Sequence, residues 1–74
     1  MNMANLRPLQ AGRVLKIQSE GAFRLQELGL RPGAEVRCLF ASPLGDPRAY
    51  LIRGAAIALR KEDAECVILD KIWD

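Results

Sequence analysis

Few of the side chains that perform chemistry in proteins are present in this sequence of 74 residues. The chain has no histidine, so it lacks the most frequent general base and the most frequent transition-metal ligand. Its two serines, Ser19 and Ser42, therefore have no imidazole partner that would activate them as nucleophiles. The sequence predicts a protein that is not an enzyme, with no catalytic residue and no cofactor.

Two cysteines and one group of acids are the remaining candidates for a reactive or metal-binding site. Cys38 and Cys66 lie in the apolar runs "VRCLF" and "CVIL", without the Cys-x-x-Cys spacing of zinc and redox motifs. We expect both to be free thiols in the core of a cytosolic protein. Glu62, Asp63 and Glu65 fall in a short polar turn and are expected to be surface charge. Weak binding of a divalent metal there is the alternative, and no metal site is predicted.

The composition is that of one small globular domain spanning residues 1–74, with 50% apolar and 27% charged residues. No apolar run approaches the roughly 18 residues of a membrane span, and the first residues lack a secretory signal, so a cytoplasmic location is expected. Ten of the eleven basic side chains lie in residues 1–61, whereas five of the nine acids follow from Glu62 onward. This asymmetry favours oriented docking or self-association. A nucleic-acid partner is not expected, and the pI of 8.8 is the main feature in favour of an RNA-binding barrel.

One helix of about ten residues is expected in "SEGAFRLQELGL". Ser19 is a suitable N-cap and Glu20 suits the first turn. A narrow apolar face is formed by residues at helical spacing, namely Ala22, Leu25 and Leu28. Gly29 is expected to end the helix in the left-handed conformation, with Leu30 folding back on the last turn.

Five short strands are predicted around this helix. The first lies in "RVLKIQ", and a type II turn with Pro32 and Gly33 at its centre leads into "EVRCLF". The inner face of these strands is expected to hold Val36, Cys38, Phe40, Tyr50, Ile52, Ile57 and Leu59, with Arg48 and Arg53 on the outer face. A single helical turn in "KEDAE" precedes the last strand, "CVILDKIW". Because open edges invite aggregation, we expect a mainly β fold: an SH3-like barrel with one short helix inserted after the first strand.

The stretch "SPLGDPR", residues 42 to 48, is predicted to form the tip of a hairpin. Pro43 and Pro47 lack backbone donors and stop the ladder, while Gly45 and Asp46 provide the reversal. Leu44 is not explained by the turn. Either it packs against the end of the barrel, or it is displayed on a stiff loop that loses little entropy when a partner binds.

The segments "RLQELGLRPGAEV" and "ASPLGDPRAYLIRGAAIALRKEDAECVIL" resemble the FeoA family over about residues 6–69. The resemblance implies an SH3-like barrel that serves bacterial ferrous iron uptake as an accessory of FeoB, a GTPase-coupled membrane transporter. It implies a cytoplasmic protein that is recruited to the inner face of the membrane. The candidate partner-binding residues are Arg24 and Glu27 on the helix, with Leu44, Gly45 and Asp46 in the hairpin.

Two alternatives stay open at the level of the sequence. The first alternative is a metal-responsive or regulatory module that binds a divalent metal or another regulator. Similar barrels occur at the C-terminal end of metal-dependent repressors, where they contact other parts of the same regulator. The second is a homo-oligomer, because small barrels can exchange or extend strands at their edges and "CVILDKIW" offers apolar surface.

Overall fold

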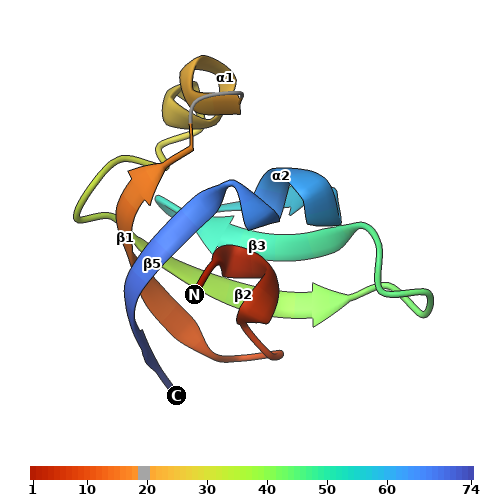
Figure 1. The fold of residues 1–74 in the computed structure, drawn as a ribbon. Coiled ribbons are helices and arrows are strands. Elements are labelled where there is room, and N and C mark those ends of the chain that lie inside the picture. The colour runs from red at the N-terminus through yellow and green to blue at the C-terminus, as the bar shows by residue number, and fades with distance from the viewer. Residues whose placement is uncertain (19–20) are drawn as a thin grey trace.

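The structure of the protein is a computed structural model that describes residues 1–18 and 21–74. It contains one five-stranded antiparallel sheet in the order β4-β3-β2-β1-β5 (Figure 1). The strands are β1 (Ala11–Ile17), β2 (Glu35–Ala41), β3 (Arg48–Ile52), β4 (Ala55–Leu59) and β5 (Val67–Trp73). The helical elements are a 3-10 helix η1 (Met3–Asn5) and the α-helices α1 (Ala22–Glu27) and α2 (Lys61–Glu65). The predicted fold of five short strands with a helix after the first is confirmed.

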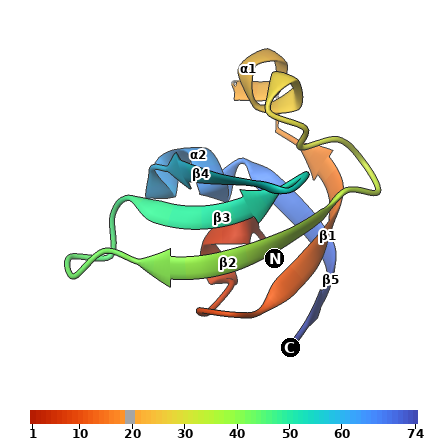
Figure 2. The same ribbon diagram turned by 180° about the vertical axis from the view of Figure 1, so that it is seen from behind.

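The sheet curls because β1 is shared between two strands. Its first residues pair with β2, and its whole length pairs with β5, with two register shifts along the way. Figure 2 shows the result from behind: β2 and β3 run across the molecule, while β1 and β5 rise at one side. The barrel was expected to close by pairing of its two end strands, but β4 and β5 do not pair with each other. The chain leaves β4 directly into α2, so that a helix, and not a backbone ladder, links the two end strands β4 and β5.

The helix α1 ends as the sequence predicts. Gly29 adopts a φ of +103°, and the amides of Gly29 and Leu30 donate to the carbonyls of Gln26 and Leu25 at 2.9 and 3.2 Å. These two bonds form a Schellman motif. Leu25 is fully buried, whereas Leu28 packs against the edge of the core. The predicted N-cap Ser19 and first-turn Glu20 lie outside the described residues.

The turn at Pro32 and Gly33 also matches its prediction. Gly33 has a φ of +91°, and the amide of Ala34 donates to the carbonyl of Arg31 at 2.9 Å. A positive φ at the third residue and this bond between the first and fourth define a type II turn.

Two predictions of side-chain direction are wrong. Phe40 is 60% exposed, because the pairing of β2 with β3 shifts between Cys38 and Phe40 and an extra residue there reverses the alternation. Arg48 lies on the same face as Tyr50, two residues along β3, and is half-buried. Its guanidinium Nη1 donates to the carbonyl of Leu6 at 2.9 Å.

The N-terminal segment completes the core, which the sequence alone did not indicate. Met3 and Leu6 are fully buried, although neither belongs to a strand. The Tyr50 hydroxyl donates to the carbonyl of Met3 at 3.2 Å and ties η1 to β3. The remaining core is apolar and comes from all the strands and from α1, and it includes Val14, Leu25, Leu30, Val36, Cys38, Ile52, Val67 and Leu69.

Both cysteines are free thiols. Cys38 is buried on β2, and this burial raises the pKa of its thiol against the opposing effect of nearby Arg48. Cys66 lies one residue before β5, at the C-cap of α2, and is only half-buried. The core prediction therefore holds for Cys38, whereas Cys66 packs at the margin of the core.

Ionisation of Tyr50 is expected to lower the stability of the fold at alkaline pH. Burial raises the pKa of its phenol to about 12 from the ordinary value of 10. The folded state therefore favours the protonated phenol, so its contribution to stability is complete below pH 10 and is lost as the pH rises toward 12. Because Tyr50 is the single tyrosine, an ultraviolet titration of phenolate absorbance reports it alone. We expect a midpoint well above 10 that coincides with unfolding; a midpoint at 10 with the fold retained would contradict the buried environment.

Candidate functional site

The loop at residues 42–47 is closed at its base and displays one leucine. The amide of Ser42 donates to the carbonyl of Pro47 at 3.1 Å, and the amide of Gly45 donates back to the carbonyl of Ser42 at 2.7 Å. Gly45 has a φ of +83°, which favours glycine at this position. Leu44 is 94% exposed, so its side chain is displayed on the loop and does not pack against the end of the barrel.

Asp46 ties the loop to the neighbouring helix. Its Oδ1 accepts a hydrogen bond from the backbone amide of Lys61 at 2.9 Å, at the first residue of α2. The first amides of a helix have no partner within the helix, so this carboxylate satisfies one of them and places negative charge at the positive end of the helix. Asp46 thus holds the loop in place, and Leu44 is carried on a loop fixed at both ends and at its side.

Removal of this contact is expected to destabilise the domain. Asp46→Ala leaves the Lys61 amide without its acceptor, and we expect a loss of about 1 kcal/mol in the free energy of unfolding. Asp46→Asn keeps an acceptor oxygen and is the matched control. Urea denaturation followed by circular dichroism measures both. Equal stability of the alanine variant and the wild type would show that the contact does not support the helix.

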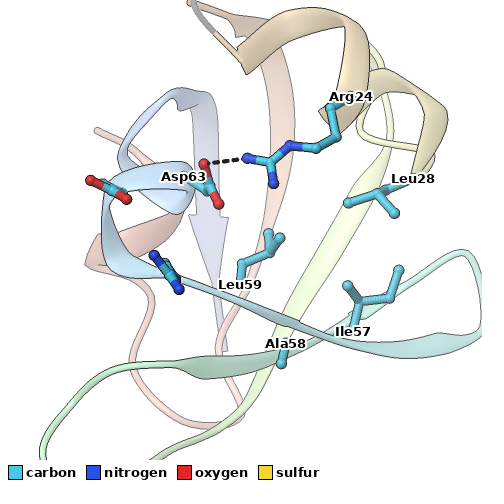
Figure 3. Close-up of a pocket in the computed structure, with 8 residues that line it drawn as sticks. Arg24, Leu28, Ile57, Ala58, Leu59 and Asp63 are labelled. Carbon is cyan, nitrogen blue, oxygen red and sulfur yellow. Dashed lines mark hydrogen bonds and ion pairs between the residues drawn. The ribbon is translucent and has the colours of Figure 1, made fainter.

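A groove lies between α1, β4 and α2 (Figure 3). Its volume is about 600 Å³, and its lining is apolar along the floor and charged along the α2 side. The lining residues are Arg24 and Leu28 of α1, Ile57, Ala58 and Leu59 of β4, Arg60, and Glu62 and Asp63 of α2. A smaller hollow of about 260 Å³ shares Arg24, Glu62 and Asp63 with it and reaches Cys66 and Gly21.

An ion pair crosses this groove from α1 to α2. The guanidinium Nη2 of Arg24 lies 2.7 Å from Oδ1 of Asp63, as Figure 3 shows. The Arg24 side chain is largely exposed, so the pair contributes at most about 1 kcal/mol to stability. Arg24 is therefore already engaged by this chain, and a partner that uses its charge has to compete with Asp63. Glu27 is exposed on the same helix.

The predicted partner-binding residues thus lie on two segments, the 42–47 loop and α1, and both segments contact α2. The loop contacts the first residue of α2 through Asp46, and α1 contacts Asp63 of the same helix through Arg24. Sequence reasoning missed Phe23, which is 78% exposed beside Arg24. Its position outside the apolar face of Ala22, Leu25 and Leu28 is the signal that indicates an exposed aromatic residue.

The acids of α2 do not form a metal site in this structure. Asp63 is turned toward Arg24, and within residues 1–18 and 21–74 no group of three or more His, Cys, Asp or Glu side chains converges to hold an ion. Among the same residues, no helix is long and apolar enough to cross a membrane.

The FeoA domain model matches residues 1–71 of the chain. The chain belongs to the FeoA domain family. Among solved structures, the FeoA protein of Chlorobium tepidum is 31% identical with a TM-score of 0.83, over 93% of this chain and 68% of that protein. A FeoA-like protein of Clostridium acetobutylicum shares the fold at a TM-score of 0.88 and 24% identity, over 95% of this chain and 84% of its own. No curated protein sequence is significantly similar to the chain.

The FeoA protein of Stenotrophomonas maltophilia is 30% identical to this FeoA-family chain with a TM-score of 0.85, over 95% of this chain and 89% of that protein. That protein was solved with zinc and is described as an SH3 domain protein and a candidate activating factor of bacterial ferrous iron transport. The likeness confirms the SH3-like fold predicted from the sequence.

Proposed function

We propose that this protein is a non-enzymatic accessory of bacterial ferrous iron uptake, and that it acts by contact with the cytosolic part of the membrane transporter FeoB. The proposal is supported by membership of the FeoA family and by the role described for the Stenotrophomonas maltophilia relative. It places the protein in the cytoplasm, recruited to the inner face of the membrane.

The observation that carries the proposal is the exposure of Leu44. An apolar side chain that is 94% exposed gains nothing for the isolated fold, because its burial energy becomes available only when another molecule covers it. The closed loop base and the contact between Asp46 and Lys61 hold it before binding, so little conformational entropy is lost when a partner docks. Gly45 and Asp46 shape this contact, while Arg24 and Glu27 of α1 form a second, charged part of the surface.

Co-purification tests this function in the cell. The tagged chain is expressed at native level in its own iron-starved cells, crosslinked gently and purified from detergent-solubilised membranes. We expect recovery of a polytopic GTPase with the wild-type chain and its loss with Leu44→Asp. Recovery of soluble proteins or RNA alone, with no membrane transporter, would refute the proposed function.

A further inference from the structure

The two end strands of the sheet differ in how they are protected against pairing with another chain. The edge of β5 is partly covered, because Asn2 forms a bridge with Ile68 and the amide of Leu69 donates to the carbonyl of Met1 at 2.9 Å. Charged Asp70 and Lys71 and two register shifts protect it further. The edge of β4 has none of these features. Its sequence is "AAIAL", and its pairing with β3 is regular throughout. Natural sheets rarely leave an apolar edge unguarded unless another strand uses it.

The backbone of β4 presents unused hydrogen-bonding groups along this edge. β3 and β4 are joined by a two-residue turn, Arg53 and Gly54, in which both φ angles are positive at 52° and 80°, as in a type I′ turn. Residues flanking such a turn form a hydrogen-bonded pair, and the pairs then alternate. Ala56 and Ala58 therefore point their N–H and C=O groups away from β3. Across the described parts of the chain, neither residue takes part in a backbone bond with a turn, loop or cap.

The groove between α1 and α2 runs along the same edge. Consecutive residues of β4 line it, although their side chains alternate in direction, so the space follows the edge of the strand and not one face. Figure 3 shows Ile57 and Leu59 pointing into the groove and Ala58 pointing away from it. Leu28 of α1 closes the apolar part of the opposite wall. The volume of the groove, about 600 Å³, is within the range of about 300–1,000 Å³ that ligand sites occupy.

The charges at the two ends of β4 select the kind of strand that fits. Arg53 precedes the strand, and Arg60 and Lys61 follow it, while the strand itself is uncharged. The acids near this end are Asp46, which accepts from the Lys61 amide, and Glu62 and Asp63 of the groove, the last of which is paired with Arg24. The strand therefore has an apolar middle, and the charged residues that flank it most directly in the sequence are basic at both ends.

A second copy of the chain fits this edge poorly. Two β4 strands that pair antiparallel about Ile57 would bring Arg53 of one copy toward Arg60 and Lys61 of the other at both ends, and like charges brought close together across a sheet destabilise it. A segment with acidic residues at its ends is attracted instead, because its charges lie near the basic residues that flank β4.

We propose that the edge of β4 binds an extended segment of a partner protein, apolar in the middle and acidic at both ends, which adds to the sheet as a further strand. Backbone groups of Ala56 and Ala58 supply the hydrogen bonds, and the groove receives every second side chain of the segment. The inference concerns a surface separate from the 42–47 loop and holds for any partner that carries such a segment, so it does not depend on the identity of the transporter.

Amide exchange with a synthetic peptide tests the proposal. The probe is acetyl-EDVTVTVDE-amide at millimolar concentration, added to the isotope-labelled full chain. We expect exchange of the Ala56 and Ala58 amides to slow by about tenfold or more, while Ala55 and Ile57, whose amides already face β3, change little. The control is the same peptide methylated on the backbone nitrogens that face β4, which keeps its side chains and charges. Absence of protection at Ala56 and Ala58, or equal protection by the methylated peptide, would overturn the proposal.

A substitution on the strand provides the second measurement. Ala58→Pro removes a donor that faces away from β3, a position where edge strands tolerate proline, and Ala58→Val keeps the donor as its control. We expect the proline variant to bind the peptide at least about tenfold more weakly, with the valine variant unchanged. If the proline variant fails to fold, the exchange experiment on the wild type decides. Protection of Ala56 and Ala58 that grows with protein concentration in the absence of peptide would identify a second copy as the occupant and overturn the proposal.

Discussion

Leu44→Asp is expected to weaken the proposed binding of this protein to FeoB by about thirtyfold or more, with no change in the fold. The few residues that dominate the binding energy of a protein interface each contribute about 2 kcal/mol or more, which corresponds to that change in the dissociation constant. Aspartate adds a charge that the interface would have to desolvate without a partner. Because Leu44 is 94% exposed, its replacement removes no packing from the core.

Binding of the purified chain to FeoB in lipid nanodiscs, followed by biolayer interferometry, measures this effect. Leu15→Asp is the matched control, since Leu15 is also an exposed leucine, 49% accessible, and lies on β1 away from the loop. Leu44→Met keeps an apolar side chain of similar volume and is expected to bind nearly as well as the wild type. If Leu44→Asp binds with the affinity of the wild type, the loop is not the contact.

Met3→Ala is expected to lower the free energy of unfolding by about 2–5 kcal/mol, the usual effect of truncating a large buried side chain. Met3 is fully buried although it precedes the first strand, and it packs in the same core as Leu6 and Tyr50. A domain of this size has a small core and a stability of only several kcal/mol, so the loss is a large part of the total. We expect the variant to be partly unfolded at physiological temperature.

Guanidinium denaturation followed by circular dichroism gives the stability of Met3→Ala, with Leu15→Ala as a control at an exposed position. Leu15→Ala removes a side chain that is half accessible and is expected to change stability by much less. Nearly equal stability of Met3→Ala and the wild type would mean that the N-terminal segment is not an essential part of the core.

Local patterns in the sequence were sufficient for much of the fold. Alternation of apolar and polar residues identified the strands, and Gly29 and Gly33 identified the end of α1 and the type II turn, because each of these features depends on neighbours a few residues away. Phe40 shows where this reasoning fails. A single extra residue in the pairing of β2 with β3 reverses the direction of every side chain beyond it, and no local signal announces it.

Contacts between distant segments were beyond the reach of the sequence for the same reason. Two bonds join residues 15 or more positions apart, from Arg48 to the carbonyl of Leu6 and from Lys61 to Asp46. Met3 is likewise buried by packing against distant parts of the chain. Leu44 was identified as unexplained by its turn, but only its 94% exposure in the folded chain shows that it is displayed. The groove along β4 was not predicted, because it depends on the position of α1 relative to α2.

Hydrogen exchange of the chain alone and bound to FeoB locates the docking surface on the chain. Mass spectrometry of the complex in detergent reports which backbone segments become protected when the transporter binds. We expect protection of residues 42–47, centred on Leu44, with a smaller change on α1 around Arg24 and Glu27. A stable complex in which residues 42–47 exchange as they do in the free chain would contradict the claim that this loop is the docking surface.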